Sequence, residues 1–347
     1  MKYEKDLSVI IPFVGEFPQI LFTIQAISQN IAESDINYEI IAINNYCEEA
    51  KEQAKTSANQ ALNKFVSAYN LKIKSGEEIL SDVYQLHKDV KSTYEDKSGE
   101  SVKACAKINP WLEYLEVSDK LSHWEAKRQA CKIAKGKHLL FVDGHTVAAA
   151  GSIPGMFAHY DEGDYHKKGS MHLPLTYKIL ESHRLIYKLK CENNFYGYSF
   201  TGFRDEEHPY EVPVMSTCGM MISKEIYDKI GGWPKHMTMY GGGENYINYT
   251  LAVMGYKKWI YPHGTLFHHG AGRDYHWTYD GMLINRLIAH YLFGGKDKLL
   301  KFANSSKGRP EVIERMVNDV LNKQKEHRNI IKAGQKLEID TWLEQWN

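Results

Sequence analysis

Short apolar runs alternate with amphipathic stretches up to about residue 150. The apolar runs are compact and β-branched, which is typical of buried strands: LSVIIPF (7–13), YEIIAINN (38–45), WLEYLEV (111–117) and KHLLFVDGH (137–145). Two segments between them have apolar residues at helical spacing: PQILFTIQAISQNI (18–31) and SHWEAKRQACKIAKG (122–136), with Gly136 expected to cap the second helix. This order of strands and helices predicts βαβ units and an α/β fold with a mostly parallel sheet flanked by helices.

The rest of the chain has a different pattern. Residues 48–107 are rich in Lys, Glu, Ser and Ala, which favours a mostly helical insertion. After residue 150 the chain is loop-rich and aromatic, and then three segments show regular patterns: a strand and short helix over 214–233, a helix over 245–256, and a strand with a histidine-rich loop over 258–277. From Gly281 the chain is polar, mildly basic and helical in pattern. We therefore expect an α/β domain over 1–280, containing the insertion, and a helical extension over 281–347.

Composition narrows the possible functions. The chain has 347 residues, 43% hydrophobic and 25% charged, which is ordinary for a globular protein with a sizeable core. Its net charge is zero, so composition gives no overall reason to expect nucleic-acid or membrane binding. The five cysteines form no CxxC pair, which favours reduced thiols, and no signal peptide or membrane-length apolar run is present. We expect a cytoplasmic protein without a membrane span.

The strand over 137–145 ends on Asp143-Gly144-His145. A carboxylate and an imidazole are competent ligands for Mn²⁺ and similar ions, and the carboxyl edge of an open α/β sheet is where ligands bind. In an extended backbone the two side chains point the same way, and Gly144 leaves the approach open. The triplet indicates a metal site; the alternative is a polar turn that only ends the strand.

A second cluster, YGGGENYINY, places glycines 241–243 before Glu244 at the start of a predicted helix. Gly242 and Gly243 would let backbone N–H groups approach a ligand closely, and a helix N-terminus favours anionic groups. Glu244 could accept hydrogen bonds from sugar hydroxyls or act as a general base. The alternative is a flexible turn before a helix whose first turn carries an acidic residue.

A third cluster, PHGTLFHHGAGRDYHW, contains four histidines close to a glycine loop: His263, His268, His269 and His276. One of them could complete a metal site begun by Asp143 and His145, and Arg273 could neutralise a phosphate. The alternative is a solvated loop.

The order of these clusters resembles the nucleotide-sugar glycosyltransferases of the GT-A fold, in the family-2-like superfamily. LSVIIPFVGEFPQILFTIQAI is similar to their opening strand and helix, and AKRQACKIAKGKHLLFVDGH to the helix and strand that carry their DxD metal motif. STCGMMISKEIYDKIGGWPKHMTMYGGGENYINYTLAVMGY resembles their acceptor-side segment. The polypeptide N-acetylgalactosaminyltransferases share DxH in place of DxD, a GGEN turn and a later histidine ligand. The resemblance covers roughly residues 6–275.

The resemblance implies a role for several residues. It implies metal ligation by Asp143 and His145, with His268 or His269 as the third ligand, and catalysis at Glu244 and Asn245. It implies nucleotide contacts by Arg128, which matches the family's helix arginine, and by three residues after the first strand: Pro12, Phe13 and Glu16. Many relatives have acidic residues after the second strand, which help to read the nucleotide; this chain has Asn44 and Asn45 there, and Asn44 is the expected nucleotide contact. The implied cofactor is Mn²⁺ or Mg²⁺, with His145 favouring Mn²⁺, and the implied donor is a UDP-sugar.

These features favour a metal-dependent glycosyltransferase that moves a hexosyl or pentosyl group to an acceptor hydroxyl. The acceptor is a saccharide, a protein, or a hydroxymethylated base in phage-type DNA. In the last case the basic residues of the tail and Lys167-Lys168 would follow phosphates. A metal-dependent hydrolase built on the Asp/His cluster and an inactive GT-A binding module are the alternatives.

Overall fold

The structure is a computed structural model. It describes residues 3–14, 16, 19–45, 102–117, 122–177, 183–192, 194–269 and 277–346. Most of the expected insertion, and Arg273 and His276, lie outside the described residues.

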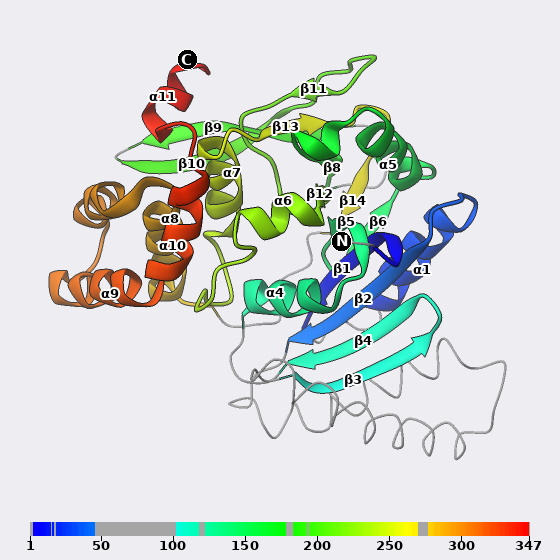
Figure 1. Ribbon diagram of the computed structural model, residues 1–347, viewed down its shortest axis with the longest axis horizontal. Helices are drawn as coiled ribbons and strands as arrows, with labels where there is room; N and C mark the ends of the chain where they lie inside the picture. The colour runs from blue at the N-terminus through cyan, green and yellow to red at the C-terminus, as the bar shows by residue number, and fades with distance from the viewer. Residues whose placement is uncertain are drawn as a thin grey trace.

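A twisted sheet forms the centre of the molecule (Figure 1). In the described part of the chain its strand order is β11-β13-β7-β12-β5-β1-β2-β4-β3. The strands are β1 (Lys5–Phe13), β2 (Tyr38–Asn45), β3 (Val102–Asn109), β4 (Leu112–Val117), β5 (Gly136–Phe141), β7 (Gly169–His172), β11 (Tyr210–Glu211), β12 (Met220–Ser223) and β13 (Lys257–Ile260). β5, β1, β2 and β4 pair in parallel, and so do β7 and β13, whereas β12 and the two edge strands pair antiparallel. The carboxyl ends of the parallel strands therefore meet at one edge of the sheet.

Both faces of this sheet are buried, as expected when helices cover it on each side. Along β2, Ile40 and Ala42 enter the hydrophobic cluster on one face, and Ile41 and Ile43 enter the cluster on the other. Residues of α1 (Gln19–Ala32) and α5 (Ser152–Glu162) belong to the first cluster. Residues of α4 (His123–Ile133), α6 (Lys224–Lys229) and α7 (Gly243–Val253) belong to the second.

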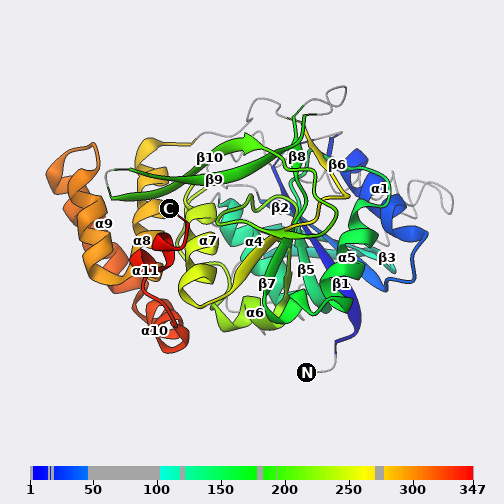
Figure 2. The same cartoon turned by 90° about the horizontal axis from the view of Figure 1, so that it is seen from above.

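A second, smaller sheet lies beside the first (Figure 2). Its order is β10-β9-β8-β14-β6, formed by β6 (Thr146–Ala148), β8 (Leu175–Thr176), β9 (Leu185–Glu192), β10 (Phe195–Gly202) and β14 (Leu266–His268). β9 and β10 are an antiparallel hairpin. β6 begins directly after the Asp143–His145 turn and pairs with β14, so this sheet brings His268 beside that turn.

The C-terminal residues form α8 (Tyr279–Ser305), α9 (Pro310–Lys323), α10 (Lys325–Gly334) and α11 (Ile339–Glu344). α8 packs along α7 and kinks at Gly295, where φ is +73°. Leu287, Phe293 and Trp342 join the same hydrophobic cluster as the sheet residues. These helices therefore add to the core of the α/β domain. The short helix η2 (Tyr165–Lys167) completes the described elements.

Several sequence predictions are confirmed, including the strands at 7–13, 38–45 and 111–117 and the helical tail. Three details were wrong. The helix after Ser122 is capped by Ala134, and Gly136 begins β5, where it pairs with Lys5 of β1. Glycine is needed there because a Cβ would lie 2.4 Å from the Ser8 backbone nitrogen. Residues 102–107, expected to be helical, belong to β3. The region after residue 150, expected to be rich in loops, contains the β9–β10 hairpin and α5.

Candidate functional site

A cavity of about 600 Å³ opens at the carboxyl ends of β1, β2 and β5. This is the edge at which open α/β sheets bind ligands. Residues from all three strand ends line it, together with residues of α4, the turn before α7 and the second sheet: among them are Pro12, Phe13, Glu16, Asn45, His123, Asp143, His145, Tyr177, Cys218, Glu244 and His268.

The Asp143-Gly144-His145 turn is tied to the first helix. The Thr23 hydroxyl donates to the Gly144 carbonyl oxygen (2.9 Å) and accepts from the Thr146 N–H (3.1 Å). A Cβ at Gly144 would lie 2.7 Å from Glu16 Oε2 and 2.9 Å from Phe13 Cβ. Only glycine therefore leaves room for Glu16 beside this turn.

Asp143 is held among cationic and imidazole groups. His268 Nε2 lies 3.2 Å from Asp143 Oδ2, and Lys127 Nζ and His123 Nε2 lie 4.0 Å and 3.8 Å from Oδ1. Burial alone would raise the pKa of Asp143, but the hydrogen bond from His268 and the positive charge of Lys127 outweigh it and hold the pKa well below its usual range. Asp143 is therefore an anionic carboxylate in the folded protein.

Helix α4 presents Lys127, not Arg128, to this site. Lys127 is fully buried, and its Nζ lies over the Trp124 ring, 4.9 Å from the centroid, with no hydrogen-bond partner. Arg128 donates to Glu125 (Nε to Oε2, 2.9 Å) and lines a separate hollow on the far side of α4. The residue of α4 that lies close to Asp143 is therefore Lys127, whereas the sequence pointed to Arg128.

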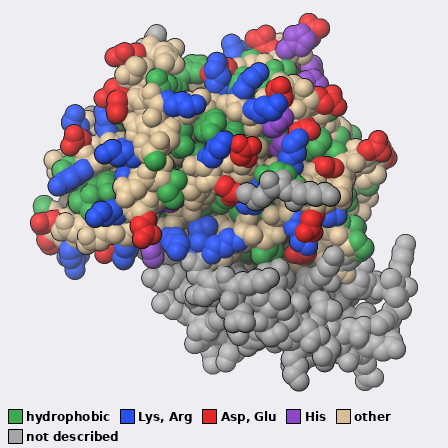
Figure 3. All heavy atoms as spheres, viewed as in Figure 1, with side chains coloured by type: hydrophobic (Ala, Val, Ile, Leu, Met, Phe, Trp, Pro, Cys, Tyr) green, Lys and Arg blue, Asp and Glu red, His purple; other side chains and the backbone are tan. Residues whose placement is uncertain are grey.

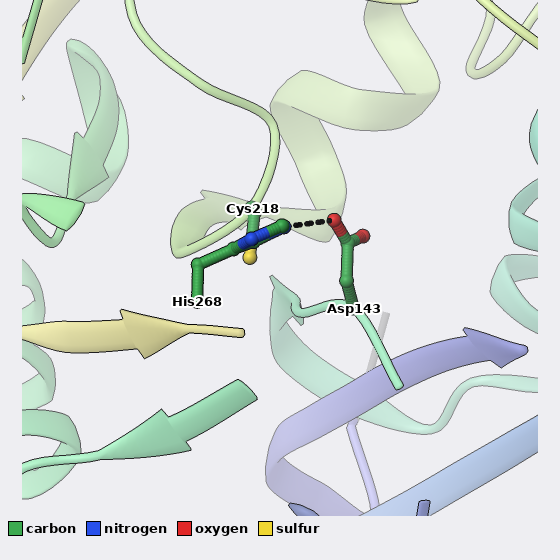
Figure 4. A group of neighbouring side chains, drawn as sticks. All are labelled: Asp143, Cys218 and His268. Atoms are coloured by element: carbon green, nitrogen blue, oxygen red, sulfur yellow. Dashed lines mark hydrogen bonds and ion pairs between the residues drawn. The ribbon is translucent and has the colours of Figure 1, made fainter. Parts of the chain in front are cut away.

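Three side chains bring potential metal-ligand atoms together. Among the described residues, one atom each of Asp143, Cys218 and His268 lie within 4.8 Å of one another (Figure 4). Cys218 is buried, and burial together with the charge of Asp143 raises the pKa of its thiol well above the ordinary value. Cys218 was not among the ligands predicted from the sequence.

His145 lies beside this group. Its ring meets that of His268 edge to face, with centroids 4.6 Å apart, and its Nδ1 lies 2.6 Å from Glu16 Oε1. A metal-bound histidine commonly donates its second ring N–H to a carboxylate, so Glu16 is suited to orient His145. His269 contributes its backbone N–H, which donates to the His145 carbonyl oxygen at 3.0 Å. The residues present thus fit a divalent ion, with His268 as the histidine nearest Asp143.

Glu244 faces the cavity from the start of α7. Its Oε1 accepts from the Thr217 hydroxyl at 2.7 Å, and its Oε2 lies 3.4 Å from the Tyr198 hydroxyl. Asn245 points elsewhere: it is buried and donates to the Tyr196 carbonyl oxygen at 2.5 Å. Asn245 therefore fixes β10 onto α7, and the catalytic role expected for it is not supported.

The glycines before Glu244 serve packing more than ligand contact. Gly241 lines the cavity. A Cβ at Gly243 would lie 2.2 Å from the Trp124 ring, and Gly242, at φ +80°, would place one 2.6 Å from Asn285 Cβ. Neither Gly242 nor Gly243 lines the cavity, so the ligand contact expected of them is not found.

Some of the residues predicted to contact a nucleotide line the cavity, and one does not. Pro12, Phe13 and Glu16 line the cavity as expected. Asn44 does not; it is buried and donates to the Tyr114 hydroxyl at 3.2 Å, and its neighbour Asn45 lines the cavity instead.

Aromatic side chains form a wall of the cavity that was not predicted from the sequence: Tyr177, Tyr187, Tyr198 and Phe200. Tyr187 and Tyr198 stack with centroids 4.6 Å apart and an interplanar angle of 5°. Tyr177 and Phe200 meet edge to face and remain 38% and 49% exposed. In β10, aromatic residues recur at every second position, at Tyr196, Tyr198 and Phe200, and this alternation was the signal for the wall.

Known proteins resemble this chain in structure but not in sequence. No family model matches the chain, and no curated protein matches it by sequence. The crystal structure of GalNAc-T7 with UDP, GalNAc and Mn²⁺ is similar over 98% of this chain, with a TM-score of 0.61 and 12% sequence identity. This chain covers 56% of that chain's length. The structure of S. aureus TarS 1–349 in complex with UDP-GlcNAc is similar over 92% of this chain and 73% of its own, with a TM-score of 0.45 and 9% identity.

The likeness to GalNAc-T7 shows that the chain has the GT-A glycosyltransferase fold, as the sequence predicted. In the described part of the chain, no helix combines the length and apolar character needed to cross a bilayer.

Proposed function

We propose that this chain is a metal-dependent glycosyltransferase, which moves a hexosyl or pentosyl group from a nucleoside-diphosphate donor to an acceptor hydroxyl. The donor that we propose is a UDP-sugar. The observation that carries the proposal is the content of the cavity. Metal-ligand groups line one part of it, and a carboxylate and aromatic rings line another, in a GT-A fold. A lysine buried behind the cavity wall, Lys127, lies 4.0 Å from Asp143.

The donor side supports a diphosphate. Asp143 and His268, with His145 beside them, would hold Mn²⁺, and a bound divalent ion neutralises the charge that develops on a departing diphosphate. Lys127 adds a positive charge 4.0 Å from Asp143 that water does not screen. GalNAc-T7, which shares the fold, was crystallised with UDP and Mn²⁺, and this supports the same pair here.

The base of the nucleotide would lie toward the ends of β1 and β2. Phe13 and Asn45 line the cavity there, and offer an apolar ring and an amide. An amide both donates and accepts hydrogen bonds, as the edge of a uracil ring requires.

The acceptor side is built around Glu244. Its two carboxylate oxygens accept hydrogen bonds from the hydroxyl groups of Thr217 and Tyr198. The bond from Tyr198 is the longer of the two, so the hydroxyl of an acceptor could take the place of the Tyr198 hydroxyl. In this role Glu244 would orient the acceptor hydroxyl and accept its proton. The acceptor hydroxyl belongs to a saccharide, a protein side chain or a hydroxymethylated DNA base.

Surface charge gives little support to the DNA acceptor. On the face drawn in Figure 3, basic and acidic side chains are interspersed. Lys167 and a basic residue of the tail, Lys298, pair with Asp164 and Asp340 at 2.7 Å and 2.6 Å.

The test is a thermal-shift panel of UDP, GDP, CDP and dTDP, each with Mn²⁺ or with EDTA. A ligand at a hundred times its Kd stabilises the folded chain by about 2.7 kcal/mol, an easily measured shift. We expect UDP to stabilise the protein only with Mn²⁺, and Asp143→Asn to remove that shift. Asp205→Asn, at an exposed aspartate, is the matched control. Stabilisation by metal without any response to a nucleotide would contradict the proposal and favour the hydrolase.

A further inference from the structure

We propose that Cys218 is a metal ligand of this site, together with Asp143 and His268, and that the site therefore prefers a thiophilic divalent cation such as Zn²⁺ or Co²⁺. The inference rests on the metal site of the proposed function. It adds a sulfur ligand that the DxH pattern does not contain, and it changes which ion the site selects.

The fold brings the three residues together from separate elements. Asp143 follows β5, Cys218 precedes β12, and His268 ends β14 (Figure 4). Gly219 joins these elements: its N–H donates to the Phe141 carbonyl oxygen at 2.7 Å, and its carbonyl oxygen accepts from the Leu173 N–H at 3.1 Å. Its φ of +83° and its contact with Leu266 require glycine here. Cys218 is thus fixed between the strands that carry the other two ligands.

The distances between the three ligand atoms are slightly longer than those around a bound metal ion. The three ligand atoms lie within 4.8 Å of one another. Around a tetrahedral ion with bonds of about 2.0–2.3 Å, ligand atoms are about 3.5 Å apart. Side-chain movements of about 1 Å would close that difference, within the reach of small rotations about χ1 and χ2.

The local groups are compatible with a bound thiolate. Cys218 is 3% exposed, so water does not compete for its sulfur, and its N–H is satisfied by the Ser216 hydroxyl oxygen at 3.0 Å. A thiolate and the Asp143 carboxylate would balance the two charges of the cation, and Lys127 would remain as a net positive charge toward a diphosphate. His268 supplies the imidazole that borderline metals prefer.

The sulfur of Cys218 would also determine which divalent ion the site prefers. Thiolate ligands favour Zn²⁺ and Co²⁺, whereas sites made of carboxylates and water suit Mn²⁺ and Mg²⁺. Replacing Cys218 by serine keeps the size of the side chain and removes the soft ligand. The ratio of Zn²⁺ affinity to Mn²⁺ affinity should therefore fall in Cys218→Ser.

The experiment is titration of the metal-free full chain with Co²⁺, followed by absorption in the near ultraviolet and the visible. Coordinated thiolate gives a thiolate-to-cobalt charge-transfer band, and the visible bands report the geometry whichever ligands are present. We expect the charge-transfer band in the wild type and its loss in Cys218→Ser. Cys131→Ser, at another buried cysteine outside the ligand group, should keep the band and controls for general effects of removing a core thiol. Circular dichroism and melting curves check that each variant folds.

The wild type alone can overturn the proposal, so it does not depend on a variant that folds. Co²⁺ binding with visible bands and no charge-transfer band would exclude Cys218, and so would a complete lack of Co²⁺ binding. Retention of the band in a folded Cys218→Ser would assign it to another cysteine and equally contradict the inference. The nucleotide panel is measured separately, so a response to UDP with Mn²⁺ and no cobalt–thiolate band would leave the transferase proposal standing and remove only the sulfur ligand.

Discussion

Glu16 Oε1 lies 2.6 Å from His145 Nδ1, and this pair links the first strand to the candidate metal site. Since Nδ1 contacts Glu16, a metal held by His145 would bind at Nε2. Gly144 makes it possible, because a side chain there would collide with Glu16. The sequence predicts Glu16 as a nucleotide contact, whereas the structure places its carboxylate against His145.

The first prediction concerns this pair. Glu16→Gln should weaken metal-dependent UDP binding by about 10- to 100-fold, the usual effect of removing the carboxylate behind a metal-bound histidine. The Kd of UDP would be measured by calorimetry with saturating and limiting Mn²⁺. If His145 is a ligand, high Mn²⁺ should restore most of the affinity. Glu4→Gln, at an exposed glutamate near the same strand, should have no effect. Equal Kd values for Glu16→Gln and the wild type at limiting Mn²⁺ would refute the role given to Glu16.

The second prediction separates two neighbours on α4. Lys127→Met removes the charge beside Asp143 and should weaken UDP binding by about 10- to 100-fold, since unit charges about 4 Å apart interact with about 1 kcal/mol in water and about 4 kcal/mol near a protein surface. Arg128→Met should leave the Kd unchanged, because Arg128 pairs with Glu125 outside the cavity. The reverse result would restore the assignment made from sequence. Melting temperatures of both variants are the control for folding.

The sequence predicted those features that depend on local pattern. Asp143-Gly144-His145 stood out because an apolar strand ended on two ligand-type residues, and Glu244 because glycines preceded it at a helix start. The buried strands followed from β-branched runs. Each of these signals lies within about a dozen consecutive residues.

The rest depended on contacts between distant segments. Cys218 has no neighbouring ligand in sequence and reaches Asp143 only because β12 pairs with β5. Whether Lys127 or Arg128 lies close to Asp143 depends on which face of α4 packs against the end of β5. His123 and Lys127, at i and i+4, were the signal for that face. The β9–β10 hairpin carried alternation and an asparagine turn, with Asn194 at φ +61°, but its polar residues concealed the strands.

The third prediction tests Glu244. Glu244→Gln keeps the size of the side chain but removes its basicity, so kcat should fall by about 10²- to 10⁴-fold while the Kd of UDP stays the same. Initial rates of sugar transfer or of UDP release give kcat, and calorimetry gives the Kd. Asn245→Ala should instead lower the free energy of unfolding, because its buried amide holds the Tyr196 carbonyl oxygen. Wild-type turnover in Glu244→Gln would remove Glu244 from catalysis.

The fourth prediction concerns stability and pH. Burial lowers the pKa of His172 and of His290 to about 3. His290 is fixed as a neutral ring: Nδ1–H donates to the Arg286 carbonyl oxygen at 2.7 Å, and Nε2 accepts from the Tyr196 N–H at 3.3 Å. Below pH 6.5 the unfolded chain binds protons that the folded chain does not, so stability is complete above that pH and declines toward pH 3.

For each such histidine, the free energy of unfolding should fall by about 2 kcal/mol as the pH is lowered from 6.5 to 5, at about 1.4 kcal/mol per pH unit. Urea unfolding at pH 7, 6 and 5 measures this slope. His290→Gln, which retains a donor and an acceptor, should give a shallower slope, and His208→Gln, at an exposed histidine, should not. A slope that is unchanged in His290→Gln would mean that His290 is protonated in the folded protein.

The last prediction concerns the aromatic wall. Phe200 and Tyr177 are large apolar rings, exposed at 49% and 38%, that face the cavity and contact each other edge to face. Rings left open beside Glu244 are suited to pack against a flat acceptor, and a favourable aromatic contact contributes about 0.5–1.5 kcal/mol. Phe200→Ala should therefore raise the KM for the acceptor by about 2- to 10-fold while the Kd of UDP stays constant. Phe22→Ala, at an aromatic residue 66% exposed on α1, is the matched control. A change in UDP affinity with an unchanged acceptor KM would instead place Phe200 on the donor side.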